Sequence, residues 1–126
     1  MNARRSVLIV DGSEETREVL RTALEQRGLR IFAASRAEAG LKLARQVQPD
    51  LIVLDLEVEP HAMARLADRF AHESRREETP LVLLGEARRR DSLPPGERVA
   101  KPYHYAPLIR KIEELLDGAR QLSAAG

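Results

Sequence analysis

Three charged residues stand directly after short apolar runs: Asp11 follows VLIV, Asp55 follows LIVL and Lys101 follows RVA. In an open α/β sheet the carboxyl ends of parallel strands meet at one edge, and ligands bind there. If the strand order is 2-1-3-4-5, the first and third strands are neighbours, which brings Asp11 and Asp55 close together. Two such carboxylates must share a proton, bind a cation or recruit a base, because their repulsion is poorly screened away from water. Lys101 is a candidate base, and Mg²⁺, which takes one or two carboxylates and keeps water ligands, is the other candidate.

Five apolar runs rich in branched residues could form the strands that carry these groups. They occupy residues 7–10, 29–33, 50–54, 80–84 and 98–100. Because the runs are continuous rather than alternating, they indicate strands covered on both faces, as in parallel sheets. Helical patterns lie between them, and they begin near Ser13, at the capping box Ser35-Arg36-Ala37-Glu38, near Pro60 and near Pro107. The alternation predicts a doubly wound α/β sheet with right-handed crossovers.

The link between the fourth and fifth runs departs from this alternation. It reads GEARRRDSLPPGER, and its apolar members other than glycine and proline are Ala87 and Leu93. A helix there would have no apolar stripe with which to dock, so we expect a fourth helix that is short or missing and a mobile segment over 86–98. Residues 119–126 are expected to form a frayed tail. The chain is thus predicted to be one domain with its core at 5–118.

The composition is that of a single globular domain. The 126 residues are 43% hydrophobic and 33% charged, and their net charge of +1 gives no reason to expect a nucleic acid partner. There are no cysteines, which excludes disulfides and thiolate metal sites. No apolar run is long enough to span a bilayer, and Asp11 interrupts the first run too early for a secretory signal. We therefore expect a cytoplasmic protein that has no membrane partner.

The stretches VLIVD, PDLIVLDL, TPLVLL and AKPY together resemble the receiver domains of two-component response regulators, over residues 7–116. The resemblance is to single-domain, chemotaxis-regulator-like members, and it implies a flavodoxin-like five-stranded sheet of order 2-1-3-4-5. It also implies magnesium-dependent phosphoryl transfer from a histidine kinase or phosphotransfer protein, followed by a signal to a downstream protein partner. By position, Asp55 matches the phosphoacceptor, Asp11 a metal-binding acid, and Lys101 with Pro102 the active-site lysine and its cis proline.

Several positions depart from the pattern that this resemblance implies. Gly12 stands where the family has a second metal-binding acid, and Gly85 stands where it has a Ser or Thr that contacts the phosphoryl group. Arg98 replaces the aromatic switch residue. Glu57 could replace the lost carboxylate, through its side chain or its backbone carbonyl, beside the two aspartates. We therefore expect magnesium binding to be weak or absent and the switch positions to be lost.

Two classes of function follow from these residues. A signalling module is favoured over an enzyme, and it could be a phosphorylated regulator or a pseudo-receiver that signals without phosphoryl transfer. The triplet Asp55-Leu56-Glu57 is superficially similar to the nucleophile motif of haloacid-dehalogenase-type phosphatases, but that motif normally follows the first strand. Flavin binding is a further possibility for this fold, yet DGSEET lacks the hydroxyl-rich phosphate loop expected after the first strand.

Overall fold

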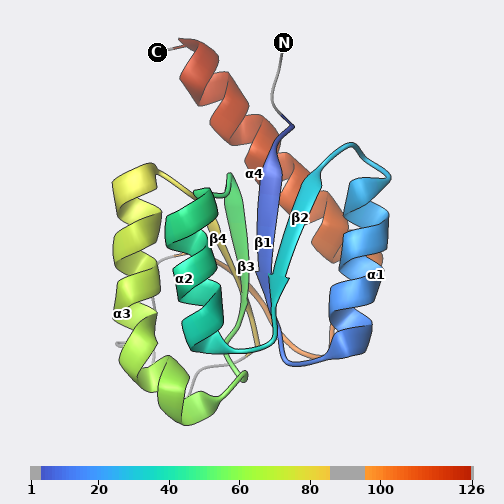
Figure 1. Cartoon of the computed structure of the whole chain (residues 1–126). Coiled ribbons are helices and arrows are strands. Elements are labelled where there is room, and N and C mark those ends of the chain that lie inside the picture. Colours follow the sequence, from blue (N-terminus) through green and yellow to red (C-terminus); the bar gives the residue numbers. More distant parts are fainter. Residues whose placement is uncertain (1–3, 86–95, 126) are drawn as a thin grey trace.

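The computed structural model describes residues 4–85 and 96–125, and Figure 1 shows the arrangement of their helices and strands. In chain order these elements are β1 (Ser6–Val10), α1 (Glu14–Glu25), β2 (Arg30–Ala34), α2 (Ala37–Val47), β3 (Leu51–Asp55), α3 (Pro60–Glu77), β4 (Leu81–Leu84), β5 (Glu97–Val99) and α4 (Tyr105–Ala125). No helix within these residues is both long enough and apolar enough to cross a membrane. The predicted shortening or loss of a helix between β4 and β5, and most of the segment 86–98 that is predicted to be mobile, fall on 86–95, outside the described residues. Residues 97 and 98 of that segment belong to β5.

The five strands form one parallel sheet in the order β2-β1-β3-β4-β5, which confirms the predicted topology. Strands β1 and β3 are neighbours, and their register pairs Val10 with Leu54. Asp11 and Asp55 each follow one of these paired residues, so both lie at the same edge of the sheet. Helices α2 and α3 cover one face of the sheet, and α1 and α4 cover the other (Figure 1).

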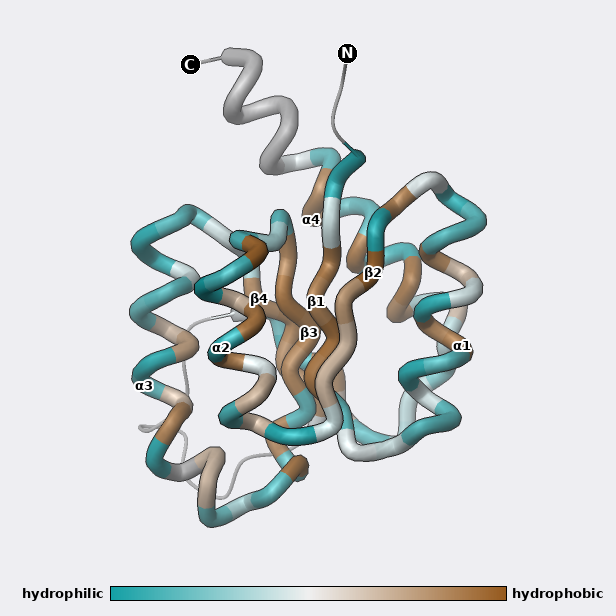
Figure 2. Tube along the Cα trace, in the orientation of Figure 1, coloured by the Kyte–Doolittle hydropathy of each residue, from teal (hydrophilic) through white to brown (hydrophobic). Residues whose placement is uncertain are grey.

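The sheet is buried on both faces, which explains the continuous apolar runs in its sequence. Every residue of β1, β3 and β4 is buried, and Figure 2 shows these strands as the hydrophobic centre between helices whose outer surfaces are hydrophilic. On the α2–α3 side the core contains Phe70, which is fully buried and is among the largest side chains of the interior. On the α1–α4 side the core is aliphatic, with Leu20, Leu24 and Ile112 packed on the strands.

Most helix starts agree with the sequence, but one predicted cap is wrong. Ser13 caps α1 by accepting the N–H of Thr16 at 3.2 Å, and Pro60 stands in the first turn of α3. Helix α2 does not begin with the predicted capping box, because Ser35 is exposed and the capping position, Arg36, makes no side-chain cap. The carboxylate of Glu59 instead accepts the N–H of Ala37 at 2.9 Å, from a loop 22 residues further along the chain.

The last helix also differs from its predicted bounds. It begins at Tyr105, two residues before the expected Pro107, and continues to Ala125, so the predicted tail from residue 119 is helical. The physical reason is that residues 119–125 contain good helix formers and no proline, and the single Gly118 is not enough to stop the helix.

Helix α2 packs unusually close to the sheet at Gly40. A β-carbon at this position would lie 2.5 Å from Cγ2 of Val10 in β1, a distance at which one of the two groups must move. A residue without a side chain is therefore what allows α2 to approach the central strand.

The cap on α2 predicts a pH dependence that can be measured at one amide. The hydrogen bond from Ala37, together with the Arg36 guanidinium 3.2 Å away, lowers the pKa of Glu59 from its ordinary value of 4.5. The cap should therefore contribute stability above pH 4.5 and lose it as the pH falls through the lowered pKa. In an acid titration followed by NMR, the amide shift of Ala37 is expected to change with a midpoint below 4.5, and Glu59→Gln should remove that step. A midpoint at or above 4.5 would contradict this cap.

Candidate functional site

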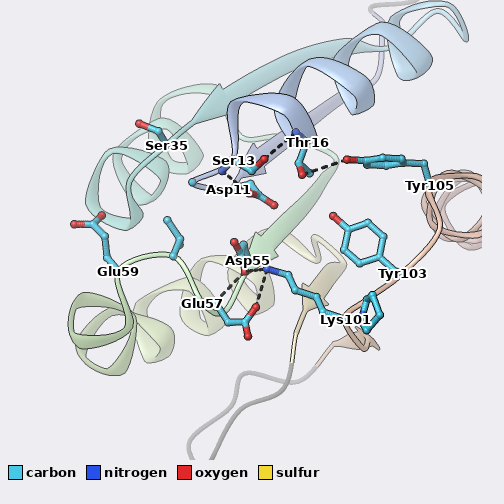
Figure 3. Close-up of a pocket in the computed structure, with 13 residues that line it drawn as sticks. Asp11, Ser13, Thr16, Ser35, Asp55, Glu57, Glu59, Lys101, Tyr103 and Tyr105 are labelled. Carbon is cyan, nitrogen blue, oxygen red and sulfur yellow. Dashed lines mark hydrogen bonds and ion pairs between the residues drawn. The ribbon is translucent and has the colours of Figure 1, made fainter.

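A cavity of about 820 Å³ lies at the carboxyl ends of the central strands, between the loops that follow β1, β2, β3 and β5 (Figure 3). It contains most of the residues that the sequence singles out. Its lining is Asp11, Gly12, Ser13, Thr16, Ser35, Asp55, Glu57, Val58, Glu59, Lys101, Pro102, Tyr103 and Tyr105. Gly85 and Arg98 do not line it; Arg98 is exposed on the edge strand β5.

Asp11 directly follows β1, and both its side chain and its backbone carbonyl accept hydrogen bonds. Its side chain is 2% exposed, and its Oδ1 accepts the N–H of Ser13 at 2.8 Å, while Arg17 donates to its backbone carbonyl, also at 2.8 Å. Burial raises the pKa of the Asp11 carboxyl; the bond from Ser13 opposes this rise, and the negative charge of Asp55 adds to it. The predicted pair of carboxylates at this edge is therefore present and electrostatically coupled.

Asp55 lies at the end of β3 and is bound directly to Lys101. It is 5% exposed, and its Oδ1 accepts both the Lys101 ammonium at 2.8 Å and the N–H of Glu57 at 3.0 Å. The same ammonium lies 2.8 Å from Oε2 of Glu57. Burial lowers the pKa of Lys101, but its bonds to the two carboxylates outweigh that effect and raise it above the ordinary value. Lys101 is thus a fixed cation at neutral pH.

The loop that carries Lys101 has the backbone conformation that the sequence predicts. The Lys101–Pro102 peptide bond is cis. In Figure 3 the lysine side chain points from this loop toward Asp55 and Glu57. Gly85, at the end of β4, has a φ of +98°, which favours glycine, and its N–H donates to the carbonyl of Val99.

Sequence reasoning missed the aromatic wall of the cavity. Tyr103 and Tyr105 both line the cavity, and their rings meet edge to face with centroids 5.8 Å apart. Both also pack against the core on the α1–α4 side of the sheet. The Tyr105 hydroxyl lies 3.3 Å from Oγ1 of Thr16 and so connects the first residue of α4 to α1. Burial and the charge of Asp11 raise the pKa of Tyr103. The position of both tyrosines just after Lys101-Pro102 was the one available signal.

Comparison with known proteins assigns this arrangement to a family. The model of the response regulator receiver domain matches residues 7–93. The chain belongs to the receiver domain family. Receiver domains are signalling modules of two-component systems, and they interact with histidine kinases or phosphotransfer proteins.

Individual relatives agree with this assignment. The chain is 49% identical over 51 residues to the KDP operon transcriptional regulatory protein KdpE of Escherichia coli, which covers 40% of this chain and 23% of that protein. It is 29% identical over 85 residues to the regulatory protein AtoC of the same organism, covering 67% of this chain and 18% of AtoC. The chain therefore spans less than a quarter of the length of these curated relatives.

Solved structures share the fold at low sequence identity. The chemotaxis protein CheY4 of Vibrio cholerae superposes with a TM-score of 0.74 at 18% identity, covering 90% of this chain and 99% of that chain. The receiver-modulated diguanylate cyclase structure from Pelobacter carbinolicus gives a TM-score of 0.76 at 21% identity, covering 95% and 98%. The predicted flavodoxin-like, chemotaxis-regulator-like fold is confirmed.

The donors in this receiver domain fit a mostly hydrated magnesium ion. Among the described residues, the side-chain hydrogen bonds of Asp11 and Asp55 are all accepted by Oδ1, so Oδ2 of each remains as a hard oxygen donor. Within the described part of the chain no three His, Asp or Glu side chains gather closely enough to bind a metal ion by themselves. The Glu57 side chain pairs with Lys101, which leaves its backbone carbonyl as the other ligand anticipated from the sequence. Magnesium accepts such a set, since it keeps several water ligands.

The buried charge of Asp11 should destabilise this receiver domain when no cation is present. Because the pKa of Asp11 is raised in the folded state, ionising it opposes folding, and stability should fall as the pH rises from 3.8 through the raised pKa. Asp11→Asn keeps an oxygen for the Ser13 N–H, so it should raise the thermal midpoint at pH 7 by on the order of 2 °C in EDTA.

The matched control for this prediction is Asp50→Asn. Asp50 also accepts a backbone N–H, from Ser6 at 2.7 Å, but it is exposed and should give no gain. A lower midpoint for Asp11→Asn would mean that the carboxylate stabilises the site even without a cation.

Proposed function

We propose that this receiver domain accepts a phosphoryl group on Asp55, inefficiently, and signals through protein contacts. The observation that supports this most directly is the buried Asp55 carboxylate, fixed by Lys101 at 2.8 Å and open to the cavity. A carboxylate so placed is a nucleophile with a cation beside the charge that develops when it reacts. The donor would be a phosphohistidine of a histidine kinase or phosphotransfer protein, and the output a downstream protein partner.

The chemistry follows from which oxygen of Asp55 is engaged. Oδ1 accepts the bonds from Lys101 and Glu57, so Oδ2 is the oxygen available to attack phosphorus. A bond forms between Oδ2 and phosphorus, the bond from phosphorus to the donor nitrogen breaks, and an acyl phosphate results. Lys101 offsets negative charge on the transferred oxygens. Bound magnesium would neutralise further charge on those oxygens, and Asp11 would supply a carboxylate oxygen to it, whereas Oδ2 of Asp55 becomes bonded to phosphorus.

The inefficiency is proposed from the two glycines. Phosphoryl transfer depends mainly on positioning and on neutralising charge, so each missing group lowers the rate directly. Gly12 supplies no third acid for a cation, and Gly85 supplies no hydroxyl for a phosphoryl oxygen. We therefore expect weak magnesium binding and slow incorporation of phosphate rather than the loss of the nucleophile itself.

The test is to incubate the protein with a small phosphodonor and magnesium and to follow its intact mass. We expect slow addition of one phosphoryl group, mapped to Asp55 by peptide mass spectrometry and absent in Asp55→Asn. Asp50→Asn, an exposed aspartate outside the cavity, is the matched control and should react like wild type. Addition at another residue, or equal addition to Asp55→Asn, would overturn the assignment.

A phosphorylation-independent pseudo-receiver is the second candidate function, and Gly12 with Gly85 is the observation that favours it. In that case the fold serves as an interaction surface, and Asp55 with Lys101 is an internal ion pair. Two results together distinguish these functions. If Asp55→Asn leaves the binding of a downstream partner intact and no phosphate is incorporated into wild type, the pseudo-receiver is the correct function.

A further inference from the structure

The carboxylate of Glu57 lies close to the place where a side chain on residue 85 would begin. A β-carbon built on Gly85 would lie 3.2 Å from both Cδ and Oε2 of Glu57, closer than most real contacts of that atom. The carboxylate of Glu57 therefore lies in the space next to the missing side chain of residue 85. From there its Oε2 reaches the Lys101 ammonium at 2.8 Å.

The same residue also contacts Asp55 through its backbone. The N–H of Glu57 donates to Oδ1 of Asp55 at 3.0 Å, and this is the oxygen that Lys101 binds. The lysine charge is thus divided between two carboxylates at equal distance, one buried and one about half exposed. Figure 3 shows both pairs converging on the lysine nitrogen.

An incoming phosphoryl group would need the Lys101 ammonium, which Glu57 binds. A phosphoryl group brings a charge of about −1.5 to −2 and three acceptor oxygens, and Lys101 is the cation that pairs with Asp55. While the Glu57 carboxylate stays on Lys101, it neutralises part of that cation and places a like charge near the transferred oxygens. The Glu57 carboxylate must move away from Lys101 before the lysine can pair fully with the phosphoryl group.

We propose that Glu57 is a built-in competitor for Lys101, an internal anion seated at Gly85 that holds the lysine until a phosphoryl group displaces it. This inference rests on the proposed phosphorylation of Asp55 and adds a cause of the slow reaction besides the loss of groups. It makes Glu57 a positioning residue that acts through Lys101.

The kinetic test compares the rate of phosphate incorporation from a small donor in magnesium. Glu57→Gln keeps the backbone N–H and the side-chain shape but not the charge, and it should react roughly two- to fivefold faster, the range expected for a partly exposed ion pair. Glu59→Gln is the matched control, because it removes the same charge from the same loop without touching Lys101. It should leave the rate unchanged. Equal rates for wild type and Glu57→Gln, or an equal gain for Glu59→Gln, would overturn the competition.

A second measurement tests the contact between Glu57 and residue 85 without any phosphodonor. Gly85→Ala should lower the thermal midpoint, partly through its positive φ and partly through contact with Glu57. The strain from the positive φ is the same whether or not Glu57 is present. A smaller loss of thermal midpoint for Gly85→Ala in the Glu57→Ala background would therefore support the contact between Glu57 and residue 85, and an equal loss would overturn it. No incorporation in wild type or Glu57→Gln would reject the phosphoacceptor role and the competition together. Incorporation at equal rates would reject the competition alone.

Discussion

Gly12→Asp is expected to speed phosphate incorporation at Asp55 about tenfold or more in magnesium, since lost metal-site groups typically cost that much in affinity or activity. A β-carbon at Gly12 would lie 3.6 Å from Cγ2 of Val58, an ordinary contact, so the new side chain has room. The added carboxylate would join Asp11 and Asp55 as a third acid at the cavity. The measurement is the rate of mass gain from a small phosphodonor across a magnesium series.

Without a cation, Gly12→Asp should lower the stability of the fold, although it speeds the reaction when magnesium is present. Without a cation a third acid adds repulsion, which should destabilise the fold by about 1 kcal/mol, or about 4 °C in thermal midpoint. Magnesium should restore the loss, because a ligand that binds the folded state stabilises it. Gly12→Asn is the matched control, because its side chain has the same size as aspartate and no charge. Its gain in reaction rate and its loss of thermal midpoint without a cation should both be smaller than those of Gly12→Asp. If wild type already reacts readily and Gly12→Asp changes nothing, the site is not deficient at this position.

Phe70→Ala should be the most destabilising single substitution among those considered, at about 3–5 kcal/mol. Phe70 is fully buried and joins α3 to the core on the α2–α3 side of the sheet. Since domains of this size are stable by roughly 5–15 kcal/mol, the loss should remove a large share of the total. Urea unfolding should show a lower midpoint with an unchanged slope.

Phe32→Ala tests whether burial rather than ring size causes this effect. Phe32 stands on the edge strand β2, half-buried, with the Arg30 guanidinium 5.4 Å from its ring centre. It should lose less than half as much stability as Phe70→Ala. Similar losses for both variants would mean that the interior around Phe70 refills when the ring is removed.

Local patterns in the sequence were sufficient for the sheet and for part of the site. Continuous apolar runs predicted five parallel strands, and the end of each run marked where Asp11, Asp55 and Lys101 meet. This worked because strand ends at a switch point are fixed by topology, which depends on a few short segments. The resemblance to receiver domains gave the strand order and the cis bond before Pro102.

The contacts that were missed depend on distant residues. Ser35 and Glu38 have the spacing of a capping box, yet the N–H of Ala37 is satisfied by Glu59, which no window around α2 contains. The ion pair between Glu57 and Lys101 lies beside Gly85, which directly follows β4 and is distant from both residues in the sequence. A glycine in the sequence states that a side chain is absent, but not which neighbouring group fills the space. Such contacts form between residues that are distant in the sequence, so a pattern within one short segment does not predict them.

The close approach of α2 to β1 has a practical consequence for anyone who wants a more heat-resistant form of this protein. Exchanging helical glycines for alanine is a common route, because alanine is favoured in helices by up to about 1 kcal/mol. At Gly40 the exchange would force a methyl group against Val10 and is a poor choice. Beyond its own helix backbone and chain neighbours, Gly118 in α4 has no described atom within 4 Å of its would-be methyl group, and it is the position to alter first.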